Sequence, residues 1–129
     1  MKINTLALVL LASTTFAACT SIKTNPAMVS DGALTGNNGM TLYVFDKDVA
    51  GSGKSVCNGP CAANWPPLIA SDFALDSDSP SSDFSLVVRD DGKKQWAVKG
   101  KPLYYWVKDQ KSGDKTGEGV NNVWHVAKP

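Results

Sequence analysis

Three residues of this chain could together bind a transition metal: Cys57, Cys61 and His125. Thiolates and imidazole are good copper ligands, and Met28 and Met40 could assist with thioether sulfur. The alternative for the two cysteines is a disulfide, because a pair four positions apart can reach the required Cα separation if the chain turns. An oxidised pair offers no thiolate, and the segment lacks the βαβ setting of thioredoxin-like proteins. The sequence therefore favours a structural disulfide, with a copper-binding or thiol-redox pair as the alternative.

His125 is the only histidine in the chain, which raises the question of catalysis. A catalytic histidine needs a nucleophile or an acid–base partner, and no motif marks a serine or a free cysteine for that role. The residue lies between Trp124 and Val126 and points away from the face that those two share if the segment is a strand. We therefore expect an ordinary, partly exposed strand histidine and a protein that is not an enzyme.

A second set of residues occurs twice, at a spacing of 61 positions. The set is a tyrosine, an aromatic residue two positions later and an aspartate five positions after the tyrosine: Tyr43, Phe45 and Asp48, and again Tyr104, Trp106 and Asp109. Aromatic faces beside a carboxylate recur in binding grooves, so each copy could be a ligand platform. Alternatively, the tyrosines anchor the core and the aspartates cap the turns that follow. The repetition favours the structural role.

The N-terminus predicts export and lipidation. Lys2 provides a basic start, and residues 6–12 form an apolar run that is too short to span a bilayer, which takes about 20 apolar residues. Small residues directly before Cys19 resemble the lipobox of bacterial lipoproteins, in which the cysteine is diacylated and becomes the new N-terminus. Phe16 departs from the leucine usual there. We expect a lipoprotein signal peptide over residues 1–18 and a lipid on Cys19.

Residues 19–27 are polar and lack periodicity, which indicates a lipidated tether. Thr20 in place of aspartate fits sorting to the outer membrane. Removal of the signal peptide with Lys2 leaves 12 basic and 12 acidic residues, so no charge pattern for nucleic acid is present. In an oxidising compartment the two remaining cysteines form an even pair, and a disulfide is the default.

Residues 28–129 predict a single, mainly β domain, because 43% of the chain is apolar, 19% is charged and no segment has a sustained helical period. Strand-forming residues and turn clusters alternate along it. We expect a hairpin of residues 27–35 with 40–46, a buried strand over 42–45, a short helical turn near 60–65, a meander of 84–89 with 95–98, a second aromatic strand over 103–107 and a terminal strand over 123–126.

These elements form about seven short strands. We expect a small antiparallel sandwich or partly open barrel, built from two pseudo-repeats at about residues 28–68 and 84–129. The second repeat lacks the cysteine-containing segment 57–68, so any function that distinguishes part of the domain is expected there.

The chain resembles the bacterial secreted-repeat lipoproteins described by a Y-x4-D motif. The resemblance rests on both copies of the motif, on the cysteine block and on the closing tryptophan segment: residues 43–48 and 104–109, Cys57, Cys61, Trp65-Pro66-Pro67-Leu68 and Trp124. It implies an exported or lipid-anchored protein. It carries over no catalytic residue, because the family has no established activity.

The expected function is that of a lipid-anchored binding or structural module of the cell envelope, with an unknown envelope ligand or protein as its partner. The expected location is the outer membrane, with the domain facing the periplasm. No cofactor is expected unless the alternative applies, in which Cys57, Cys61 and His125 bind copper.

Overall fold

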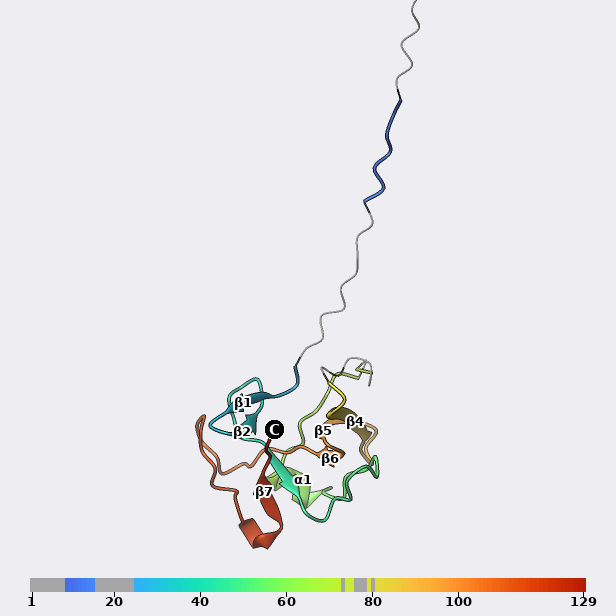
Figure 1. Cartoon of the computed structure of the whole chain (residues 1–129). Helices are drawn as coiled ribbons and strands as arrows, with labels where there is room; N and C mark the ends of the chain where they lie inside the picture. Colours follow the sequence, from blue (N-terminus) through green and yellow to red (C-terminus); the bar gives the residue numbers. More distant parts are fainter. Residues whose placement is uncertain (1–8, 16–24, 73, 76–78, 80) are drawn as a thin grey trace, which may run out of the picture.

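The computed structural model describes residues 9–15, 25–72, 74–75, 79 and 81–129. The predicted lipidation site, Cys19, lies outside these residues. Within them, no helix combines the length and the apolar character that a membrane crossing requires. Figure 1 shows the small β domain that the chain forms from Asn25 onward.

In the part of the chain that the structure describes, seven short strands make up three small antiparallel sheets. The first sheet pairs β1 (Met28–Ser30) with β2 (Ala33–Thr35), the second pairs β3 (Tyr43–Phe45) with β7 (Trp124–Val126), and the third has the order β4 (Phe84–Val88), β5 (Lys94–Val98), β6 (Lys101–Pro102). The described residues also include two short helical segments: α1 (Pro60–Asn64) and the 3-10 helix η2 (Val120–Asn122). The predicted class, mainly β with one short helical turn near 60–65, is confirmed; the described strands do not close into a barrel.

The predicted hairpin of residues 27–35 with 40–46 is only partly present. The chain reverses earlier, at Asp31 and Gly32, whose φ angles of 49° and 72° suit a two-residue hairpin turn between β1 and β2. Beyond it, a single bridge joins Thr35 to Thr41. The following strand, β3, pairs instead with β7, which brings the first repeat against the end of the second.

The second aromatic strand, predicted over residues 103–107, is not formed, because β6 ends before it, at Pro102. Only β6 continues the third sheet, and Tyr104 then forms isolated bridges to Tyr43 and to Pro67. The carbonyl oxygen of Pro66 accepts the N–H of Tyr105, but Pro66 has no N–H to donate in return, so this pairing does not continue as a ladder. The bridge between the two tyrosines is reciprocal, with N···O distances of 2.8 Å and 3.0 Å. The two motif tyrosines therefore lie opposite each other.

Backbone hydrogen bonds show that the two repeats exchange their last segments. The N–H of Leu34 donates to Ala127 O, the N–H of Ala127 to Leu42 O and the N–H of Leu42 to Leu34 O, which closes a triangle. Two members come from the first repeat and one from the second. The same triangle, with the repeats reversed, joins Trp96 to Leu68, Leu68 to Leu103 and Leu103 to Trp96. Each repeat thus completes its backbone pairing with the other.

The core has two parts, and each part contains residues from both repeats. One is largely aliphatic and contains Leu34, Leu42 and Leu103; the other is aromatic and contains Tyr43 and Tyr104, both fully buried. The strand predicted to be buried on both faces is so, because its alternate residues enter the two parts: Leu42 and Val44 the first, Tyr43 and Phe45 the second.

Candidate functional site

The repeated tyrosines and aspartates pair across the repeats. The hydroxyl of Tyr43 donates to Oδ2 of Asp109 at 2.5 Å, and the hydroxyl of Tyr104 donates to Oδ2 of Asp48 at 2.6 Å. The second oxygen of each carboxylate accepts a backbone N–H from the loop that follows it, at 2.7 Å from Val56 for Asp48 and at 3.0 Å from Thr116 for Asp109. Each aspartate therefore fixes its own loop and holds the opposite tyrosine.

Burial determines the protonation of these pairs. It raises the pKa of Tyr43 and of Tyr104 well above the usual tyrosine value, and the hydrogen bond to the facing carboxylate adds to the effect. Burial also raises the pKa of Asp48, against the lowering effect of the hydrogen bond from Tyr104. The phenols therefore remain neutral donors at ordinary pH. They hold the fold together rather than transfer protons.

Four aromatic rings form a continuous stack at the junction of the repeats. The ring centroids are 4.2 Å apart between Phe45 and Trp124, 3.8 Å between Trp124 and Trp65, and 3.9 Å between Trp65 and Trp106. Members from the two repeats alternate along the stack. The two inner rings, Trp65 and Trp124, are nearly parallel, at 4°.

The tyrosines close the sides of this stack in a matching way. Tyr43 meets Trp65 edge-on at 5.4 Å, and Tyr104 meets Trp124 edge-on at 5.2 Å. Trp65 and Trp124 each lie three residues before the residue that their repeat contributes to the triangle of the other repeat, Leu68 and Ala127, so they are counterparts. The expectation that the second repeat lacks the whole segment 57–68 is therefore wrong. It has a counterpart tryptophan and a short helix, η2, where the first repeat has α1, and it lacks the cysteines and the prolines of that segment.

Cys57 and Cys61 form a disulfide, with their Cα atoms 5.2 Å apart. Cys57 is fully buried, whereas Cys61 is partly exposed. The bond joins the loop after Asp48 to α1. The guanidinium of the buried Arg89 supports the same loop by donating to the carbonyl oxygen of Cys57 at 2.7 Å.

Arg89 belongs to a buried polar network that the sequence did not reveal. It also donates to Ser55 Oγ at 3.1 Å and to Gln95 Oε1 at 2.8 Å, and Ser55 Oγ lies 2.5 Å from the hydroxyl of Tyr104. The network therefore connects the disulfide loop to the Tyr104–Asp48 pair. The only sequence signal was the position of Arg89, two residues after the buried Val87 in an alternating segment.

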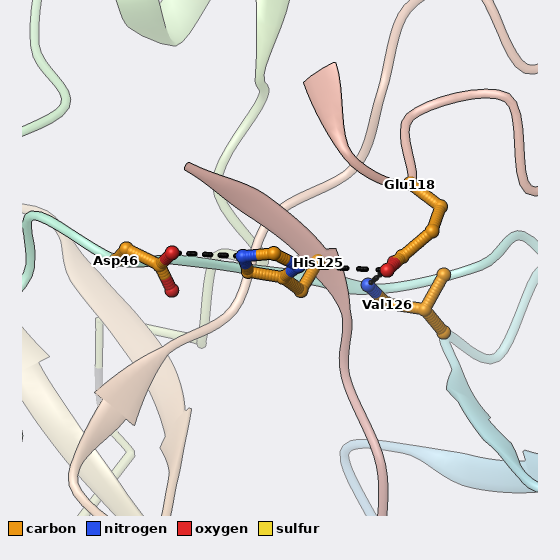
Figure 2. A network of polar contacts seen from close by, with 4 residues as sticks. All are labelled: Asp46, Glu118, His125 and Val126. Carbon is orange, nitrogen blue, oxygen red and sulfur yellow. Dashed lines mark hydrogen bonds and ion pairs between the residues drawn. The ribbon is translucent and has the colours of Figure 1, made fainter. Parts of the chain in front are cut away.

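His125 lies between two carboxylates (Figure 2). Its Nε2 is 2.8 Å from Oδ2 of Asp46, and its Nδ1 is 3.4 Å from Oε1 of Glu118. The other oxygen of Glu118 accepts the backbone N–H of Val126. The hydrogen bond to Asp46, assisted by Glu118, raises the pKa of His125. Neither carboxylate was identified from the sequence, because both lie in turns, Asp46 at 79 positions from the histidine and Glu118 at seven.

The three residues of the copper alternative do not form a ligand group in the described structure. The cysteines are bonded to each other, and His125 contacts carboxylates. Among the described residues, no three histidine, cysteine, aspartate or glutamate side chains lie close enough together to hold a metal ion.

A cleft of about 450 Å³ opens beside the aromatic stack, between α1 and η2. Three of the buried rings line it, those of Phe45, Trp65 and Trp124. Exposed polar side chains line it as well, namely Lys47, Asn64 and Asn121, together with Cys61 and Val123. Within the described part of the chain, these three polar side chains make no hydrogen bond or ion pair. The cleft therefore joins both repeats and carries hydrogen-bonding groups that the fold does not use.

One family model matches this chain twice, over residues 27–69 and 85–128, and it describes a secreted repeat of unknown function. The two matched segments agree with the two halves that exchange backbone triangles, and the resemblance inferred from the sequence is thereby confirmed. A secreted family corresponds to a location in the cell envelope or outside the cell. No curated protein and no solved structure matches the chain.

Proposed function

Because the chain belongs to the family of secreted repeats of unknown function, we propose that it is a lipid-anchored binding module of the cell envelope. Its binding surface is the cleft between α1 and η2. The observation that carries this proposal is the set of unused polar side chains beside the buried stack: Lys47, Asn64 and Asn121.

The cleft has the properties of a preformed ligand site. Its volume of about 450 Å³ falls within the usual range of about 300–1,000 Å³ for small-molecule sites. Its inner wall is rigid, because Trp65 and Trp124 are stacked on each other and each is held by a buried tyrosine. A rigid wall lowers the entropic cost of binding, since little has to be ordered when the ligand arrives.

The N-terminal sequence supports an anchor. A signal peptide over residues 1–18 followed by Cys19 fits an outer-membrane lipoprotein whose domain faces the periplasm. The tether is expected over residues 19–27, but Pro26 and Ala27 are buried in the domain, so a free tether ends by residue 25 and spans at most about 25 Å when fully extended. The cleft would therefore remain close to the membrane surface and would meet ligands of the adjoining envelope.

Anchoring is tested with Cys19→Ala in the producing cells. The wild-type protein should sediment with the outer membrane, and the variant should appear in the soluble fraction. Retention of the variant in the membrane fraction would contradict lipidation.

Ligand binding is tested by mixing the soluble full chain with fractionated envelope material and measuring what is retained. The cleft variant combines Asn64→Ala with Asn121→Gly, since glycine keeps the φ of 53° at position 121 without strain. Asn37→Ala, in an exposed turn, is the matched control. Retention should be lost in the cleft variant only. Equal retention of all three proteins would contradict the cleft as the binding surface.

The alternative function, copper binding or thiol redox by Cys57 and Cys61, draws on the partial exposure of Cys61 in the cleft. A reductant could reach that sulfur, and the reduced pair would supply thiolates. Mass spectrometry under native and reducing conditions, with copper added after mild reduction, separates the two functions. A mass short by two hydrogens, with no metal retained and no copper uptake after mild reduction, would eliminate the copper alternative.

A further inference from the structure

We infer that the ligand of the cleft is an amino sugar that bears a carboxylate, with Lys47 binding the carboxylate and Asn64 and Asn121 binding the amide and hydroxyl groups. This inference rests on the proposed function, since it specifies the ligand class of the same cleft. Four features of the cleft support it: its charge, its polar side chains, the backbone conformation at Asn121 and the orientation of its tryptophan rings.

The charge of the cleft favours an anion. Lys47 is the only side chain with a net charge among the described residues that line it, and no carboxylate lines it. The neighbouring carboxylate, Asp46, is engaged by His125 in the contact drawn in Figure 2. The ammonium group of Lys47 therefore has no partner in the described part of the chain and is available to one carboxylate of a ligand.

The two asparagines favour a ligand with both hydrogen-bond donors and acceptors. Each side-chain amide offers one carbonyl oxygen and two N–H donors, which match the acetamido and hydroxyl groups of an amino sugar. Asn64 ends α1 and Asn121 lies in η2, so the amides approach the cleft from the two repeats. A ligand between them would contact both halves of the domain.

The backbone around Asn121 is held in an unusual conformation. Asn121 and Asn122 have φ angles of 53° and 59°, and consecutive non-glycine residues in the left-handed region are strained. Such strain persists where the surrounding structure fixes it, and it collects at binding sites. Here the two left-handed residues lie between Gly119 and Trp124, and Asn121 lines the edge of the cleft.

The two tryptophans of the cleft offer no face to a planar aromatic ligand. The faces of Trp65 and Trp124 are covered by each other and by the outer rings of the stack. Their edges remain for the cleft, and ring edges carry partial positive charge. Edges of this kind suit the oxygen atoms of a sugar acid and offer no face for stacking.

The test compares two sugars that differ in one group. The soluble full chain carrying Cys19→Ala is titrated with N-acetylmuramic acid and with N-acetylglucosamine, which lacks the lactyl carboxylate, and tryptophan fluorescence and amide NMR shifts are followed. We expect the acid to bind about tenfold or more tightly, as one hydrogen bond to a charged group allows. The NMR shifts should centre on Asn64 and Asn121.

Lys47→Met should reduce the preference for the acid to about twofold or less, because only the charged contact is removed. Lys54→Met, at an exposed lysine outside the cleft, should leave the preference intact. Equal affinity for the two sugars, or an unchanged preference in Lys47→Met, would overturn the inference. If another envelope component binds and is lost in the Asn64→Ala, Asn121→Gly variant, the proposed function stands and only the sugar-acid ligand is wrong. If no envelope fraction binds, both are wrong.

Discussion

The hydroxyl of Tyr43 donates a 2.5 Å hydrogen bond to Asp109, which belongs to the other repeat. Tyr104 and Asp48 form the reciprocal pair at 2.6 Å. The tyrosine and the aspartate of one motif therefore serve two different pairs, and the motif has to occur twice for either pair to exist. Each aspartate binds the backbone of the loop that follows it and the tyrosine of the other repeat. The spacing between tyrosine and aspartate, which is the same in both motifs, places the carboxylate where it can make both contacts.

Double-mutant cycles should show this coupling across the repeats. Tyr43→Phe and Asp109→Ala should each destabilise the domain by about 1–3 kcal/mol, because each leaves a buried polar partner unsatisfied. Combined, they should show a coupling energy of about 1–3 kcal/mol in chemical denaturation.

The control is the pair within one motif. Tyr43→Phe combined with Asp48→Ala should be additive within about 0.5 kcal/mol, because these two side chains make no direct hydrogen bond. Strong coupling within the motif and none between motifs would contradict the exchanged arrangement.

Sequence reasoning predicted the class of fold and the repeats, because strand-forming residues, turn clusters and the 61-residue spacing are all local signals. It did not predict the exchange. The same pattern is compatible with Leu42 closing a triangle within its own repeat, and only packing selects Ala127 as its partner.

The buried polar residues were missed for a similar reason. From the sequence, Arg89 is expected to be an ordinary exposed arginine at the end of a strand. Its partners give no local signal, because they lie in a loop more than thirty positions earlier and on the next strand. The partners of His125 lie in turns that no local pattern relates to it, Asp46 at 79 positions from the histidine and Glu118 at seven. The cleft could not be predicted at all, since it arises where the repeats meet.

The inner rings of the stack should be more important for stability than the outer ones. Trp65→Ala and Trp124→Ala should each cost about 3–5 kcal/mol, because both rings are buried and stacked on two sides. Such a loss approaches the whole stability of about 5–15 kcal/mol that a domain typically has.

Trp106→Ala is the matched comparison, because Trp106 is partly exposed and stacks on one ring only. It should cost clearly less than either inner variant in urea denaturation. Equal losses for all three tryptophans would show that the stack does not distribute stability in this way.

Removing the disulfide should weaken the domain without unfolding it. For so short a loop, replacing Cys57 and Cys61 with serine should cost about 2 kcal/mol. The fold should persist, because Arg89 still holds the carbonyl oxygen of residue 57 and Asp48 still holds the N–H of Val56. Denaturation of the double variant and of the reduced wild type measures this cost, and unfolding of either at room temperature would show that the bond is required for folding.

Stability should fall as the pH rises through the pKa of His125. The hydrogen bond to Asp46 raises that pKa in the folded state above the value of about 6.5 expected in the unfolded chain. The stabilising contribution of the protonated imidazole is therefore fully present below about pH 6.5 and is lost as the pH rises through the higher folded pKa.

Because 41% of the histidine side chain is exposed, the loss of stability should stay below about 1 kcal/mol. Urea denaturation from about pH 5.5 to pH 9, with NMR titration of the ring, should give a declining free energy of unfolding in the wild type and a flatter curve in His125→Gln. A curve that rises over this interval in the wild type, or a histidine that titrates below its ordinary value, would contradict the contact drawn in Figure 2.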